Sequence, residues 1–160
     1  MRTLLLAIAT VAITMPLAAT ATSFERAYGL DELSTRAETV VMGEVQGTWT
    51  ETTSDGWWTV ATLVVDETLQ GRHEPVVEVR YPGGSVGDLH LVVSGAPALH
   101  PGDDVVVFTR AGGKVLGLAQ GVWKIEEDGH ATRDLSRLAF KDGAHPVESM
   151  PLEDLKDIMR

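Results

Sequence analysis

The sequence predicts a mainly β protein whose antiparallel strands close into an OB-like barrel, with a short N-terminal helix and a C-terminal helix. Two observations lead to this prediction. Segments rich in valine and threonine recur with alternating polarity between turn signals, and one of them, residues 57–69, is longer than a usual strand and must bend. Closure of the sheet also removes the edges that valine-rich strands would expose. A β-sandwich is the alternative.

The segment 95–108 is the centre of this prediction. Within it, Pro101-Gly102 indicates a tight reversal, because proline presets φ and glycine accepts a positive φ. The run Val105–Phe108 that follows shows no polar alternation. Such a run is typical of a central strand that is covered on both faces.

The other elements follow from periodicity and turn signals. Residues 31–38 have helical spacing with acidic residues in the first turn, and Gly43 or Gly47 is expected to mark a bulge. The segment 82–87 reads as a glycine loop, whereas 130–148 fits either a helical turn or a returning strand. A final amphipathic helix begins at Pro151. Strands are expected at residues 39–50, 57–69, 75–81, 89–93, 105–108, 114–118 and 122–127.

Residues 1–21 have the features of a cleaved signal peptide. A short positive start precedes an uncharged apolar stretch at 4–17, and the Ala-Thr-Ala sequence at 19–21 fits a cleavage site. The apolar stretch is shorter than the roughly 20 residues that a membrane span needs. We therefore expect a single β-barrel domain, residues 22–160, that is secreted or periplasmic and has no stable membrane anchor after cleavage.

Composition excludes several classes of function. The chain has no cysteine, which removes thiol catalysis, zinc–thiolate sites and iron–sulfur ligation. Arg2 is the only charged residue before the cleavage point, so the mature chain has 12 Lys and Arg against 23 Asp and Glu, a net charge of −11. Such an acidic surface repels phosphate backbones, and nucleic-acid binding is not expected.

An ordered set of segments resembles a group of exported bacterial proteins whose activity is uncharacterised. The resemblance covers residues 37–125 and implies only a shape and export. The segments that carry it are Ala37-Glu38-Thr39-Val40-Val41-Met42-Gly43-Glu44-Val45, Glu67-Thr68-Leu69-Gln70-Gly71, Pro82-Gly83-Gly84, 95–108 and Gly117-Leu118-Ala119-Gln120-Gly121.

A second set of segments is similar to the netrin-like module, the OB-type barrel of tissue inhibitors of metalloproteinases. It consists of the strand start at 40–45, the strand end Leu69-Gln70-Gly71 and the strand at 102–108. The resemblance implies a barrel and a role in regulating an exported protease. Members of that family inhibit through an N-terminal cysteine, which this chain lacks; its expected mature start is Thr22-Ser23. The inhibitory mechanism therefore does not transfer.

Histidines and carboxylates give one weak candidate for a metal site. His100, Asp103 and Asp104 lie close together in the sequence, but aspartates in a tight turn more often accept hydrogen bonds from backbone N–H groups. No histidines have the i, i+4 or H-x-H spacing of metal ligands. His90, on the polar face of its strand, is a further candidate with the same simple alternative of a solvated side chain.

Serine and carboxylate chemistry has little support in the sequence. Ser85 lies in a glycine-rich loop and Ser94 precedes a glycine, but neither has the G-x-S-x-G elbow of the α/β hydrolases. The loop at 82–87 lacks the lysine and the following helix that phosphate binding needs. No catalytic residue and no cofactor is therefore predicted.

The tryptophans are the most suggestive group. Trp49, Trp57 and Trp58 flank one hairpin, and Trp123 is expected nearby. Rings at the mouth of a barrel form a stacking platform for a sugar or a partner side chain, although tryptophans that cap a core are the commoner case.

The sequence thus favours an exported, non-enzymatic interaction module with a protein partner, for which Trp49, Trp57 and Trp58 are the candidate contacts. The alternatives are an exported metal-binding protein or hydrolase that uses His90, His100, Asp103 or Asp104, and a small-ligand carrier that uses the tryptophans. The oligomeric state and the identity of the partner are not predicted.

Overall fold

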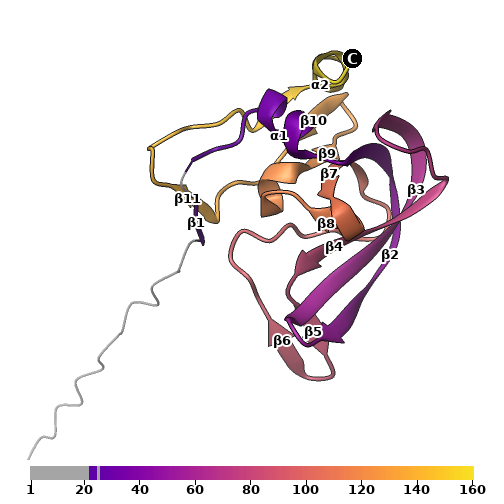
Figure 1. Ribbon diagram of the computed structural model, residues 1–160, viewed down its shortest axis with the longest axis vertical. Helices are drawn as coiled ribbons and strands as arrows, with labels where there is room; N and C mark the ends of the chain where they lie inside the picture. The colour runs from indigo at the N-terminus through magenta and orange to yellow at the C-terminus, as the bar shows by residue number, and fades with distance from the viewer. Residues whose placement is uncertain (1–21, 25) are drawn as a thin grey trace, which may run out of the picture.

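The computed structural model describes residues 22–24 and 26–160, so the expected signal peptide at 1–21 lies outside the described residues. The described chain is mainly β, with one short helix near each of its ends (Figure 1). Its helices are α1 (Leu30–Arg36) and α2 (Leu152–Ile158), and its 3₁₀ turns are η1 (Ala111–Gly113) and η2 (Leu118–Gly121). Its strands are β1 (Thr22–Phe24), β2 (Thr39–Thr53), β3 (Gly56–Gln70), β4 (Val76–Pro82), β5 (Gly84–Val86), β6 (Leu89–Leu91), β7 (Asp104–Arg110), β8 (Lys114–Val115), β9 (Val122–Ile125), β10 (His130–Thr132), β11 (Leu138–Phe140) and β12 (Ser149–Pro151).

The main sheet returns on itself. Its strand order is β12-β10-β9-β7-β2-β3-β4-β8, and β8 also pairs with β7. The pairings therefore run in a closed circuit through β7, β2, β3, β4 and β8. Within the described chain, β1–β11 and β5–β6 form two further, two-stranded sheets. The pairings β1–β11 and β4–β8 are parallel, and the other pairings are antiparallel as the sequence predicts.

Strands β2 and β3 form a long bent hairpin. The register shifts between Val40 and Val41, between Met42 and Gly43, and between Val45 and Gly47, which confirms a bulge at both predicted glycines. A side chain on Gly43 would collide with the backbone carbonyl of Val64, so close approach of the two strands requires glycine there. The bulges allow this hairpin to curve, so that one of its faces lines one hydrophobic core and the other face covers a second core.

Strand β7 is covered on both faces, which confirms the prediction of a central strand. It pairs with β2 on one side and with β9 on the other, and residues 105–109 are all buried. Val105 and Val107 face an inner core enclosed by the strand circuit, whereas Val106 and Phe108 face an outer core beneath the helices. The inner core comprises Val41, Val45, Ala61, Leu63, Val79, Tyr81, Leu99, Val105, Val107, Val115 and Val122. The outer core comprises Leu30, Leu33, Ala37, Val40, Val106, Phe108, Leu116, Trp123, Ala131 and Leu155.

The two helices cover the outer core. α1 buries Leu30 and Leu33, and α2 buries Leu155, because apolar residues at helical spacing share one face. An ion pair of 2.6 Å between Lys156 Nζ and Glu67 Oε2 joins α2 to β3. Pro151 is the N-cap of α2 rather than its first helical residue.

The sequence prediction is wrong in several connecting segments. Residues 84–86, expected to be part of a glycine loop, form β5, and the expected strand 89–93 is only the three-residue β6. Gly87 has a φ of 58° and allows the tight turn between them. The segment 114–118 contains only the two-residue β8, because Gly117 with a φ of 67° leads into η2. The uncertain segment 130–148 contains the strands β10 and β11 and no α-helix.

Candidate functional site

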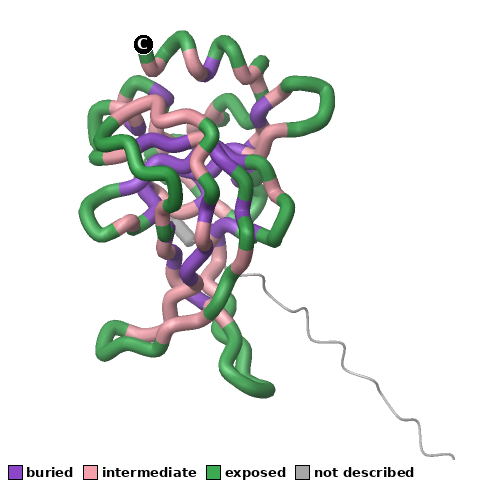
Figure 2. Tube along the Cα trace, turned by 90° about the vertical axis from the view of Figure 1, so that its right-hand side faces the viewer, coloured by how far each residue is buried: buried purple, intermediate pink, exposed green. Residues whose placement is uncertain are grey.

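The free end of the β2–β3 hairpin and the β5–β6 hairpin lie together at the end of the molecule opposite α2 (Figure 1). We call this end the tip. Two hydrogen bonds join its parts: the Ser85 N–H donates to Thr50 Oγ1 at 2.9 Å, and the Gly83 N–H donates to the Trp57 carbonyl at 2.9 Å. Figure 2 shows that the loops at this end are exposed, whereas the buried residues gather toward the middle and the α2 end.

The three tryptophans of β2 and β3 do not form one platform. Residues directly opposite each other in an antiparallel pair share a face. Trp49 lies opposite Val60 and Trp58 lies opposite Glu51, which places both of these rings on one face of the hairpin. Trp57 lies opposite Thr52 and therefore on the other face. The Lys114 ammonium lies 5.0 Å from the Trp58 ring centroid, a cation–π distance that ties this ring to β8.

Trp57 is the tryptophan that contributes to an apolar hollow at the tip. Gly56, Trp57, Leu89, His90 and Leu91 line this hollow. Val86 lies directly opposite Leu89 in the β5–β6 pair, so Val86, Leu89 and Leu91 project from the same side of the small sheet. The tip therefore combines one indole ring with three aliphatic side chains, all from residues that are at least partly exposed.

Ser85 and His90, which were separate candidates in the sequence, meet at the tip. They lie opposite each other in the β5–β6 pair, and Ser85 Oγ is 2.7 Å from His90 Nδ1. A serine nucleophile also needs a group that orients its histidine and donors that stabilise an oxyanion. Among the described residues no carboxylate bonds to His90, and both side chains are exposed on a short hairpin. The pair has the contact of a catalytic dyad without its supporting groups.

The residues considered as metal ligands, His100, Asp103 and Asp104, form a turn that is joined to Lys124 by an ion pair. Asp103 Oδ2 accepts the His100 backbone N–H at 2.8 Å and lies 2.7 Å from Lys124 Nζ, while Asp104 is exposed. Partial burial alone would raise the pKa of Asp103, but the bonds from Lys124 and from the His100 backbone outweigh it, and the pKa is lowered. Across the described residues no group of three or more His, Asp or Glu side chains is arranged to hold a metal ion.

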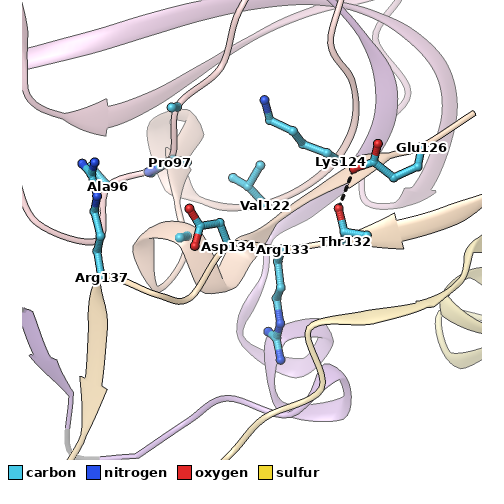
Figure 3. A pocket seen from close by; sticks show the side chains of 11 residues that line it. Ala96, Pro97, Val122, Lys124, Glu126, Thr132, Arg133, Asp134 and Arg137 are labelled. Atoms are coloured by element: carbon cyan, nitrogen blue, oxygen red, sulfur yellow. Dashed lines mark hydrogen bonds between the residues drawn. The ribbon is translucent and has the colours of Figure 1, made fainter.

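A pocket of about 390 Å³ lies between the segment 96–98, β9 and the segment 132–137. Lys124, Glu126, Arg133, Asp134 and Arg137 contribute the charges of its lining. Most of these charges have partners: Lys124 is paired with Asp103, and Thr132 Oγ1 donates to Glu126 Oε1 at 2.8 Å (Figure 3). Figure 3 also shows that the Arg133 side chain points away from the other labelled charged groups.

Trp123 lies far from the tip, contrary to expectation. It is fully buried in the outer core, where β9 pairs with β7, and the Arg133 guanidinium stacks on its ring at 4.4 Å. Arg133 and Gln120, which are both buried, were not among the residues predicted from the sequence. Gln120 lies in the segment 117–121, which carries the first resemblance but assigns it no role, and Arg133 belongs to no motif or periodic pattern. The sequence feature nearest to this cluster is Trp123, which lies on β9 beside the central strand β7.

No membrane-spanning helix is formed by the residues that the structure describes. Comparison of the chain with protein-family models, with curated proteins and with solved structures finds no match.

Proposed function

We propose that the protein is an exported binding module that recognises another protein through the tip. The single observation that carries this proposal is the cluster of exposed apolar side chains on one side of the β5–β6 sheet. Leu89 is 65% exposed, Leu91 44% and Val86 43%, and Trp57 borders the same hollow. Clustered large apolar side chains that remain in contact with water mark interaction surfaces.

The geometry of β6 supports a protein partner. Among the described residues, β6 pairs only with β5, so its outer edge offers unpaired backbone groups beside the hollow. An extended segment of a partner can add a strand to such an edge and place alternate side chains against Trp57 and Leu91. This mode requires neither a cofactor nor a reaction centre.

We also propose that the circuit β7-β2-β3-β4-β8 closes as an OB-like, netrin-like barrel. The β4–β8 and β7–β8 pairings support this reading, and the netrin-like order of strands favours an exported protease as the regulated partner. An experimental structure in which β8 separates from β4 would contradict the barrel. Export predicts that N-terminal sequencing of the mature protein begins at Thr22.

The partner surface is tested by site-specific photocrosslinking in cells that export the protein. A benzophenone amino acid replaces Leu89 in one variant and Val76 in a control, because Val76 is an exposed apolar strand residue, at 48%, outside the tip. We expect a discrete crosslinked species from position 89 that is absent from position 76, and we expect Trp57→Ala to reduce it severalfold. The proposal fails if position 89 gives no crosslink, or if both positions give the same pattern.

The contact between Ser85 and His90 favours a second candidate function, ester hydrolysis at the tip. Ser85→Ala separates the two candidates. A binding module retains its crosslink at position 89 in this variant, whereas a hydrolase loses turnover of an activated ester such as p-nitrophenyl acetate. Turnover by the intact protein that Ser85→Ala abolishes would establish the hydrolase and contradict a non-enzymatic role.

A further inference from the structure

Arg133 is a buried cation without a carboxylate partner. Its residue is 5% exposed, and its guanidinium lies 4.4 Å from the centroid of the Trp123 ring. Nε donates to the Val147 carbonyl at 2.8 Å and Nη1 to the Gln120 carbonyl at 3.0 Å. Within the described chain no carboxylate oxygen lies within 4 Å of its nitrogens. Burial lowers the pKa of Arg133 to about 10, and the more distant Glu148 offsets only part of this shift.

Two further hydrogen-bond donors beside Arg133 lack acceptors. Trp123 Nε1 and Gln120 Nε2 are buried atoms, and neither has a hydrogen-bond partner among the described residues. The orientation of the Gln120 amide is fixed, because its Oε1 accepts the Tyr28 backbone N–H at 2.7 Å. Buried polar groups in folded proteins nearly always have partners, and an unmet donor costs stability. Arg133 itself donates to two carbonyl oxygens, so the described residues around it supply hydrogen-bond acceptors but no negative charge within 4 Å.

Arg133 and Trp123, but not Gln120, adjoin a mainly apolar pocket of about 370 Å³, a size within the range of small-molecule sites, which begins at about 300 Å³. Trp123 and Arg133 form part of its wall, and the segment 27–31, the segment 146–150 and Ile158 of α2 form the rest. Asp31 is the acidic residue of this lining, so the negative end of a ligand is expected at Arg133 and away from Asp31. Figure 3 shows that Arg133 extends away from the neighbouring charged pocket, toward the ribbons of the N-terminal and C-terminal segments. Arg133 lines both pockets, and its side chain extends toward the apolar one.

We propose that this pocket binds a small monocarboxylate with an apolar body, with the carboxylate received by Arg133 and the body packed against Tyr28, Met150 and Ile158. A carboxylate supplies the negative charge that the guanidinium of Arg133 lacks as a partner, and it accepts hydrogen bonds from that guanidinium. The apolar wall selects against small, fully hydrated anions such as acetate, because they leave the pocket unfilled. This binding site is separate from the tip and does not depend on the function proposed for it.

The proposal is tested by calorimetric titration of the mature protein with two carboxylates of different shape, octanoate and 2-naphthoate. Each has a neutral counterpart of similar size, 1-octanol and 2-naphthalenemethanol. We expect saturable 1:1 binding of at least one carboxylate, at least tenfold tighter than binding of its alcohol. Absence of saturable binding by both carboxylates at 1 mM overturns the proposal, and so does equal affinity for acid and alcohol.

Two variants and one control locate the site. Arg133→Met removes the charge but keeps most of the side-chain volume, and we expect it to weaken carboxylate binding at least tenfold. Ile158→Trp replaces an aliphatic side chain at the partly exposed rim with a larger indole. We expect a similar loss of carboxylate affinity with the fold intact. Arg137→Met, in the neighbouring pocket, should leave the affinity unchanged.

Circular dichroism shows whether each variant is folded. If Arg133→Met does not fold, Ile158→Trp decides the location on its own. Carboxylate binding that persists unchanged in Ile158→Trp, or that is lost equally in Arg137→Met, contradicts the assignment to this pocket.

Discussion

The inner and outer cores lie on opposite faces of the same strands, yet they differ in chemistry. The inner core is built from aliphatic side chains and alanine, with the single aromatic ring of Tyr81, whose hydroxyl accepts the Leu99 N–H at 3.4 Å. The outer core contains Trp123, and Gln120 and Arg133 are buried beside it. The interior of the strand circuit is therefore apolar apart from a hydroxyl that has a hydrogen-bond partner. The layer between sheet and helices contains hydrogen-bond donors without acceptors among the described residues and a positive charge.

This difference suggests a test that compares the two cores by stability and by ligand binding. A closed circuit of paired strands satisfies its own backbone groups and can be filled with apolar side chains alone. The outer layer is assembled from α1, η2, α2 and the segment 130–150; Gln120 of η2 and Arg133 of that segment are buried polar side chains within it. We expect substitutions in the inner core to change the free energy of unfolding, and substitutions in the outer core to change ligand binding with smaller effects on stability.

The largest expected effect is in the inner core. Leu63 is fully buried there, and Leu63→Ala removes buried methyl groups and leaves a cavity that the closed strands cannot collapse around. We expect a loss of about 2–5 kcal/mol in the free energy of unfolding, measured by urea denaturation. The matched surface variant is Val64→Ala, since Val64 is its neighbour and is 41% exposed, and it should change stability by less than about 0.5 kcal/mol. Similar losses in the two variants would contradict an enclosed core.

A smaller effect is expected in the outer core. Trp123→Phe removes the indole N–H together with part of the ring, and that N–H has no acceptor among the described residues. The loss of packing costs stability, but the removal of an unmet donor offsets it, so we expect a net loss of at most about 1.5 kcal/mol. The measurement is again urea denaturation, without added carboxylate. A loss above about 3 kcal/mol would show that the N–H has a partner and would weaken the contrast between the cores.

Individual residues show how much of this could be predicted from the sequence. Local patterns were sufficient for the long strands, for the burial of 105–108 and for the bulges at Gly43 and Gly47, because the periodicity of two and the special role of glycine are local properties. The outer-core cluster could not be predicted in this way. Gln120 and Arg133 are 13 positions apart, and they meet only because η2 and the chain after β10 pack together.

The tip gives a similar lesson. Ser85 and His90 were each identified as candidates from the sequence. The glycine-rich segment was interpreted as a loop, whereas it forms part of a hairpin that places the two residues opposite each other. The opposite faces of Trp57 and Trp58 follow from their adjacent positions in one strand, whereas which of the two shares a face with Trp49 depends on the register of β2 and β3. A shift of one residue in that register would exchange these two rings, with Trp57 on the face of Trp49 and Trp58 on the opposite face.

The smallest expected effect concerns the polar link at the end of the inner core. Asp103 holds the turn after Leu99, a buried residue of that core, and connects it to Lys124 of β9. Asp103→Asn weakens this link, and we expect a loss of about 1 kcal/mol at pH 7, because the ion pair is partly exposed. The pKa of Asp103 is lowered in the folded protein, so its carboxylate contributes stability above the ordinary pKa of 3.8, and this contribution is lost as the pH falls through the lower folded value.

Denaturation with urea at pH 7, 5 and 3 measures this dependence. The difference in stability between the intact protein and Asp103→Asn should stay constant from pH 7 to pH 5 and shrink at pH 3. Asp104→Asn is the matched control, because Asp104 is exposed and lies opposite Glu44, where loss of a like charge is neutral or slightly stabilising. A difference that persists unchanged at pH 3, or that Asp104→Asn reproduces, would show that the Asp103 carboxylate does not hold the end of the inner core in place.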